Sequence, residues 1–314
     1  MHLSKPWFPG NKPSAALLGP GADQALAPLA SPEIRWRVRL AYAQHWIRRR
    51  FQEHVGLAAD RMLFRRWMQA TPDSRCIEAL GLPRRSVEAE LGEDVLTLYA
   101  DPRKLIRIVA NRPNAAGSRP PSVAFIWDGD WDLHREDLRR GTRYRMISEL
   151  DENRHDLARS NIYQELMADL QRGSPWSSHQ EGIVLNTPAK IYRYLQVYLA
   201  YLDGMAAHGF DASRGKDALG VAISREGRIL KVNRGLHRLA MAQRLGLPAV
   251  PVRVRCVHRM WWNQVVQGAS GQAALDRVRL ALRNCVPEEL AGPLDTEEPA
   301  TSNFAWPPTL RSKI

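Results

Sequence analysis

The strongest chemical signal in the sequence is a short run, Gly235-Leu236-His237-Arg238, that opens a helical pattern ending at Gly246. A helix N-terminus presents unpaired backbone N–H groups and the positive end of the helix dipole, which together suit a phosphate. Glycine lets the backbone approach a ligand closely, and arginine donates forked, charge-assisted hydrogen bonds to phosphate oxygens. Gly235, His237 and Arg238 are therefore candidate phosphate-binding residues. The alternative is an ordinary first helical turn with solvated polar side chains.

A second candidate is an acidic cluster, Asp128-Gly129-Asp130-Trp131-Asp132, which follows a strand-like apolar stretch. Three carboxylates within five residues can bind a divalent cation or act as a general base, as phosphoryl transfer requires. Asp128 and Asp130 are candidate Mg²⁺ ligands, and Asp128, Asp130 and Asp132 are candidate catalytic groups. The alternative is an acidic turn whose tryptophan packs in the core. His258, at the end of a later strand, is a candidate nucleotide contact or, alternatively, a structural histidine.

Secondary-structure patterns indicate which elements position these residues. Leu219, Val221 and Ile223 alternate, and residues 225–228 form a turn before an apolar return, which predicts a hairpin. A helix is expected over 236–246, and alternating residues over 250–256 predict the next strand. The region 71–93 gives no clear pattern. Further helices are expected at 32–51, 57–68, 156–171 and 190–208, and further strands at 95–99, 104–109 and 123–127.

The composition points to a globular protein with anionic partners. The 314 residues are 44% hydrophobic and 25% charged, with a net charge of +12 and a pI near 10.0. No stretch approaches the roughly 20 apolar residues of a membrane span. The three cysteines form no CxxC pair, which argues against a disulfide scaffold or zinc ribbon and fits a cytoplasmic location. The motifs GxxxxGK[ST], GxSxG and HExxH do not occur.

Half of the net charge lies near the N-terminus. Residues 31–70 contain nine arginines against Glu33, Glu53 and Asp60, a local charge of +6. Arginines on helices at this density can contact a nucleic-acid backbone, so the arginine-rich residues 35–66 are a candidate nucleic-acid surface. The alternative is a solvated helix face.

The run from Val221 to Val254 resembles the ParB/sulfiredoxin superfamily, in which a strand pair is followed by a G-x-x-R type of turn, then by L-A-x-A-x-x-L-G and an I-P-V strand. Asp101-Pro102 and the helix before Gly209 are similar to earlier elements of that family. The resemblance implies an α/β (α+β) fold with a small mixed sheet and packed helices. It also implies that the turn, including Asn233, cradles the phosphates of ATP or CTP.

The sequence departs from this family at informative positions. Sulfiredoxins carry their catalytic cysteine where this chain has Leu236, so sulfinic-acid reduction is not expected. Many relatives have an aspartate before the glycine of the turn, whereas this chain has Asn233 and Arg234 before Gly235. This difference weakens the case for a metal or hydroxyl contact there. Partition proteins follow this core with helix-turn-helix elements, and because the residues after Trp262 are few and end Pro-rich, a full partition protein is not expected. A narrower, uncharacterised ParB-like group pairs G-D-W-D with H-x-x-W, and both occur here, the second at His258 to Trp261.

Four parts are expected: a loose arm (1–31), a basic helical extension (32–93), the ParB/sulfiredoxin-like domain (94–268), and a C-terminal helix with a Pro-rich tail (269–314). The leading hypothesis is a nucleotide-binding protein. Free-serine kinases share the superfamily. The hypothesis therefore includes phosphotransfer to a small molecule or glycan with Mg²⁺. The alternatives are a non-enzymatic nucleic-acid-binding or regulatory protein, and a scaffold whose site has decayed.

Overall fold

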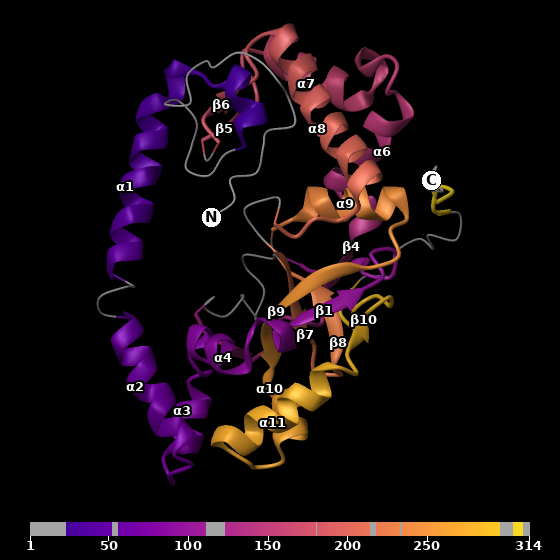
Figure 1. Cartoon of the computed structure of the whole chain (residues 1–314). Helices are drawn as coiled ribbons and strands as arrows, with labels where there is room; N and C mark the ends of the chain where they lie inside the picture. The colour runs from indigo at the N-terminus through magenta and orange to yellow at the C-terminus, as the bar shows by residue number, and fades with distance from the viewer. Residues whose placement is uncertain are drawn as a thin grey trace. The chain divides into compact units, whose positions relative to one another are not determined.

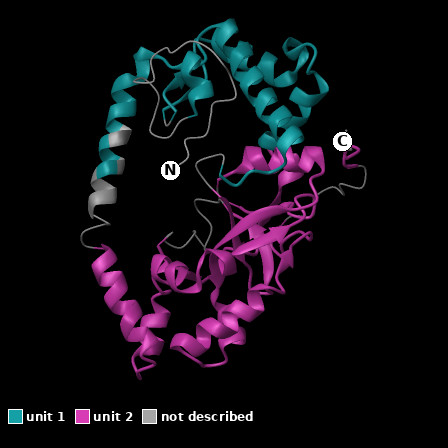
Figure 2. Ribbon diagram, in the orientation of Figure 1, with its two compact units in different colours: residues 1–52, 142–216, 310–314 teal, residues 53–141, 217–309 magenta. Residues whose placement is uncertain are grey.

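The computed structural model describes residues 23–51, 56–110, 123–179, 181–213, 218–232, 234–295 and 304–309. Contacts divide the chain into two compact units, shown in Figure 2. Unit 1 comprises residues 1–52, 142–216 and 310–314, and unit 2 comprises residues 53–141 and 217–309. Residues 142–216, which lie within the expected domain at 94–268, group with the N-terminal helix in unit 1, and the remaining described residues of that range group with the sheet in unit 2.

Unit 2 is built on a mixed sheet, which confirms the predicted fold class (Figure 1). Its strands are β1 (Thr97–Ala100), β2 (Arg107–Val109), β3 (Ile126–Trp127), β4 (Arg135–Asp137), β7 (Leu219–Ile223), β8 (Arg228–Lys231), β9 (Val250–His258) and β10 (Val286–Pro287). The strand order is β1-β9-β7-β8-β2-β4, with β10 beside β8 and β3 beside β9. Strand β7 runs parallel to β9 and antiparallel to β8, so the sheet combines both kinds of pairing.

The predicted hairpin is the centre of this sheet. Val221 pairs with Lys231 and Ile223 with Ile229, and all five residues of β7 are buried. The turn closes with a hydrogen bond from Ser224 N–H to the carbonyl of Arg228 at 2.8 Å. A short apolar run bounded by turn residues suits a central strand, because such a strand has no solvent-facing side.

The helices of unit 2 pack around the sheet and against one another. They are α2 (Leu57–Met68), α3 (Ser74–Ala79), α4 (Arg84–Leu91), α5 (Glu93–Leu96), the 3-10 turn η5 (Leu138–Arg140), α9 (Leu236–Leu245), α10 (Arg259–Val266) and α11 (Gly271–Leu282). The aromatic rings of Trp67 and Phe125 lie 6.2 Å and 6.3 Å from Trp262, which joins α2 and α10 to the segment before β3. The predicted helices at 57–68 and 236–246 are confirmed, and the unassigned region 71–93 contains α3 and α4.

Unit 1 is mainly helical. It contains η2 (Gln24–Leu29), η3 (Pro32–Ile34), α1 (Arg35–Phe51), α6 (Thr142–Glu152), η6 (Leu157–Arg159), α7 (Asn161–Gln171), β5 (Ser177–Ser178), β6 (Ile183–Val184) and α8 (Pro188–His208). Helix α8 begins at Thr187, whose Oγ1 accepts from Lys190 N–H at 3.2 Å, and ends at Gly209 with φ of 72°. The predicted helices at 32–51, 156–171 and 190–208 correspond to α1, α7 and α8, whereas α6 was not expected.

Candidate functional site

The predicted phosphate-binding turn joins the end of β8 to the start of α9. Arg234 and Gly235 both have left-handed backbone conformations, with φ of 71° and 70°. Gly235 is the N-cap of α9 and gives it no side-chain cap. A β-carbon at position 235 would lie 2.6 Å from Cδ2 of Leu219, the first residue of β7. This position therefore needs glycine for both its conformation and its space. Asn233 lies outside the described residues.

Lys231 lies beneath this turn and was not singled out by the sequence. Its side chain is fully buried at the last position of β8. The ammonium group donates to the carbonyls of Gly220 at 3.0 Å and Arg234 at 2.7 Å, and also to the carbonyl of Val232. These bonds hold the residues that precede Gly235 against β7, so this part of the turn is held in one shape.

The C-terminal end of helix α9 is bonded to the connection between β1 and β2. Arg103 Nε donates to the carbonyl of Gln243 at 3.0 Å, and its Nη2 donates to the carbonyl of Arg244 at 3.4 Å. A guanidinium at a helix C-terminus is favourable because it satisfies terminal carbonyls and opposes the negative dipole end. His237 and Arg238 lie half-buried on the first turn, at the opposite end of this anchored helix.

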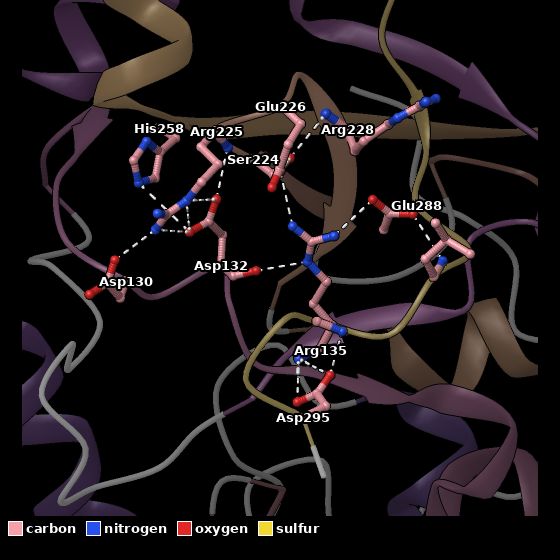
Figure 3. Close-up of polar contacts among 12 residues, drawn as sticks. Asp130, Asp132, Arg135, Ser224, Arg225, Glu226, Arg228, His258, Glu288 and Asp295 are labelled. Carbon is pink, nitrogen blue, oxygen red and sulfur yellow. Dashed lines mark hydrogen bonds and ion pairs between the residues drawn. The ribbon is translucent and has the colours of Figure 1, made fainter. Parts of the chain in front are cut away.

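The aspartates of the acidic cluster are bound by arginines, as Figure 3 shows for Asp130 and Asp132. Asp128 accepts from Arg259 Nε at 2.9 Å, and Asp130 accepts from Arg225 Nη2 at 2.8 Å. The carboxylates of Asp128 and Asp130 are 62% and 59% exposed. Within the described ranges, no group of three or more His, Cys, Asp or Glu side chains is placed to hold a metal ion. The two aspartates remain predicted Mg²⁺ ligands, and their arginine partners favour the alternative of an acidic turn.

Asp132 differs from its neighbours because it is completely buried. It accepts from the backbone N–H of Arg225 at 2.8 Å and from the guanidinium Nη2 of Arg225 at 2.7 Å. The side-chain hydrogen bonds with Asp132 raise the pKa of Arg225 above its usual value, against the opposing effect of burial. The ion pair therefore fastens the turn of the β7–β8 hairpin to the loop that follows β3.

His258 belongs to the same group of contacts. Its Nδ1 accepts from Met260 N–H at 3.0 Å and so caps α10, while its Nε2 lies 2.8 Å from the carbonyl of Gly129. Both contacts are satisfied at once by the neutral tautomer that carries its proton on Nε2. The imidazole ring centroid lies 5.6 Å from that of Trp131. These contacts give His258 a structural role at this loop.

The predicted site residues therefore fall into two groups at opposite ends of β7. Gly235 lies against Leu219, which begins β7, whereas Arg225 holds Asp132 just after β7 ends. At 3.3 Å per residue, this five-residue strand separates the groups by about 13 Å. His258 ends β9, where that strand pairs with the last residue of β7. His258 therefore lies at the end of β7 that is away from the predicted phosphate-binding turn.

Arg135 connects the acidic loop to distant acidic residues, as Figure 3 shows. This buried arginine donates to Glu226 at 2.9 Å, to Glu288 at 2.8 Å and to the carbonyl of Asp132 at 2.7 Å. Glu226 in turn accepts from Ser224 Oγ at 2.6 Å. A buried arginine that donates to several acceptors typically has a structural role. Each hydrogen bond offsets part of the free-energy cost of removing the guanidinium group from water.

The arginine-rich residues 35–66 are shared between the two units. Arg35, Arg37 and Arg39 are exposed on α1 in unit 1. Arg61 and Arg65 are exposed on α2 in unit 2. Residues 52–55 between the helices lie outside the described residues. Each helix therefore presents its own basic surface.

Comparisons with protein-family models, with curated proteins and with solved structures gave no match to this chain. The resemblance to the ParB/sulfiredoxin superfamily therefore rests on the sequence motifs alone. Among the described helices, none combines the length and the apolar character needed to cross a membrane.

Proposed function

We propose that this chain binds a nucleotide of the ATP or CTP type through its phosphates at residues 233–238. The observation that carries the proposal is the pair of left-handed residues Arg234 and Gly235, which turns the chain from β8 into a ten-residue helix. A left-handed residue next to a right-handed one, as Gly235 is next to the helical Leu236, directs successive N–H groups into an anion-binding concavity, and the helix dipole strengthens it. Arg238, on the first turn, adds a guanidinium that suits phosphate oxygens.

The bonds of Lys231 support this orientation of the backbone. The carbonyl of Arg234 points toward the buried ammonium of Lys231, at 2.7 Å. In a trans peptide the C=O and the following N–H point in opposite directions. The N–H of Gly235 is therefore directed away from the interior, on the side where a phosphate would bind. The donors at this turn, which are backbone N–H groups, an imidazole and guanidinium groups, suit an anion.

The proposal is limited to binding. Phosphotransfer to a small molecule or glycan was expected to use Asp128, Asp130 and Asp132 with Mg²⁺. Asp130 and Asp132, however, are bound to Arg225 just after β7, a strand about 13 Å long whose other end lies against the turn. All three aspartates are bound by arginines. No step of phosphoryl transfer is therefore assigned to them.

The alternative function is nucleic-acid binding, and the exposed arginines of α2 favour it. Arg61 and Arg65 stand four residues apart on one helix, so both can reach a phosphate backbone. Duplex DNA binding that weakens steeply with salt, and that is lost in Arg61→Gln/Arg65→Gln, would support this function.

A thermal-shift screen tests the nucleotide proposal. The purified chain is heated with ATP, ADP, CTP or GTP, with and without Mg²⁺, beside Arg238→Gln and the control Arg244→Gln at the other end of α9. A ligand at one hundred times its Kd adds about 2.7 kcal/mol, or about 5–10 °C of melting temperature. We expect this shift in the parent chain and in Arg244→Gln, and a shift about half as large or smaller in Arg238→Gln. An equal shift in both variants, or no shift with any nucleotide, would contradict the proposal.

A further inference from the structure

Helix α1 buries one side and exposes the other. Val38 packs with Ile34, which directly precedes the helix, against Val184 of β6. With 3.6 residues per turn, Trp36 and Leu40 lie on the side opposite this contact. Trp36 is 61% exposed and Leu40 is 51% exposed. Neighbouring large apolar side chains that are both exposed on one helix face are typical of a binding surface.

Arginines surround these apolar residues. Arg35, Arg37 and Arg39 are all exposed, and the guanidinium carbon of Arg37 lies 5.2 Å from the ring centroid of Trp36. Trp46, farther along the same helix, is 58% exposed. A helix that combines tryptophan and leucine with flanking arginines fits the boundary of a bilayer, where the rings enter the headgroup region and the guanidinium groups reach the lipid phosphates.

We propose that this surface of α1 binds an anionic lipid bilayer, lying in the plane of its headgroups. The surface, called here the Trp-Arg face, consists of Arg35, Trp36, Arg37, Arg39 and Leu40. The proposal goes beyond nucleotide binding and uses residues of unit 1 only. It requires no membrane-spanning helix, because an interfacial helix buries only one face in the lipid.

Charge and apolar exposure together favour a bilayer over other occupants. A nucleic-acid backbone would use the arginines but would gain nothing from the exposed Leu40, since it offers no apolar region at that depth. A second copy of the same face would place like charges against one another, which costs energy unless they are paired. An anionic bilayer satisfies both parts of the face, since it offers phosphates and an apolar interior within one side-chain length.

Vesicle co-sedimentation of the full chain tests the proposal. Vesicles contain phosphatidylcholine alone or mixed with phosphatidylglycerol. The charge variant carries glutamine at Arg35, Arg37 and Arg39, and the apolar variant is Trp36→Ser/Leu40→Ser. The control removes the same charge from exposed positions of unit 2 and is Arg75→Gln/Arg85→Gln/Arg283→Gln.

We expect binding to the anionic vesicles and much weaker binding to phosphatidylcholine. Each arginine of the face should contribute about fivefold to partitioning, so the charge variant should lose about a hundredfold. The apolar variant should lose about tenfold. The control should lose less than about threefold, because its arginines lie on another unit.

Two outcomes would overturn the proposal. One is that the parent chain does not bind anionic vesicles. This outcome includes the case in which the parent chain binds duplex DNA instead, and the charge variant alone loses the DNA binding. The other is an equal loss in the charge variant and the control, which would attribute binding to total charge. Brominated lipids give a second readout with the parent chain: they should quench tryptophan fluorescence, and Trp36→Phe should reduce the quenching. Unchanged quenching in Trp36→Phe would also count against the Trp-Arg face.

Discussion

Replacing Gly235 with alanine is expected to destabilise the sheet unit by about 2–5 kcal/mol. The residue has φ of 70°, and a side chain in the left-handed region costs about 1–2 kcal/mol. The new β-carbon would lie 2.6 Å from Leu219 Cδ2, well inside the contact distance of about 3.5–4.0 Å. Leu219 is buried at the start of the central strand, so relieving the overlap should cost about 1–3 kcal/mol more.

Urea unfolding followed by tryptophan fluorescence measures this cost, and Gly268→Ala is the matched control. Gly268 has φ of 79° but nothing within 4 Å of the position a β-carbon would take, so only the backbone cost of about 1–2 kcal/mol applies. In a Leu219→Ala background the additional cost at Gly235 should disappear, because Cδ2 is absent. Equal destabilisation by the two glycine substitutions, or strict additivity with Leu219→Ala, would refute the reasoning.

Three further predictions concern buried polar groups. Lys231→Met should reduce the free energy of unfolding measured in urea by about 2–5 kcal/mol, because the carbonyls that accept from its ammonium lose their donor; a cost below about 1 kcal/mol would contradict this role. Asp132→Asn should lower the free energy of unfolding by about 3–5 kcal/mol in the same assay, because it breaks a buried ion pair. Asp130→Asn should lower it by less than about 1 kcal/mol, because its ion pair is exposed. Similar losses in the two variants would argue against a structural role for Asp132. Burial raises the pKa of Tyr198 to about 12, an effect that the hydrogen bond with Tyr194 opposes, so the neutral phenol is favoured in the folded chain. The corresponding stability is complete below the unfolded pKa of about 10 and is lost as pH rises toward about 12. The melting temperature of Tyr198→Phe should therefore depend less on pH in this window, and an identical pH profile would contradict the assignment.

The sequence predicted the elements that local patterns define. The β7–β8 hairpin, α9 and β9 follow from alternation, a turn with Gly227, and helix-ending glycines, all of which lie within about 40 consecutive residues. Strand β1 begins two residues later than expected, because residues 93–96 form the short helix α5. Local signals overlap there, since an apolar run of this length suits either a strand or a helix.

The contacts that hold the site together could not be predicted from the sequence, because they join residues that are far apart along the chain. Arg225 and Asp132 are 93 residues apart, and Arg135 and Glu288 are 153 residues apart. The pattern of charges along the chain does not reveal such pairs, because the packing of the strands determines which charged residues meet. Lys231 was missed for a different reason: its position in a strand gave no sign that its ammonium would bind the backbone of the following turn. For the same reason the sequence could not show that the predicted phosphate-binding turn and the acidic cluster lie at opposite ends of β7.

Isothermal titration calorimetry of ATP and CTP with the parent chain, Arg238→Gln and Arg244→Gln tests the nucleotide proposal most directly. We expect at least one nucleotide to bind the parent chain, with an affinity about tenfold to a hundredfold weaker in Arg238→Gln, as befits loss of a charge-assisted contact to phosphate. Arg244→Gln should stay within about twofold of the parent chain, because its position is at the other end of α9. Absence of binding to either nucleotide, or equal affinities in the two variants, would contradict a phosphate site at the start of α9.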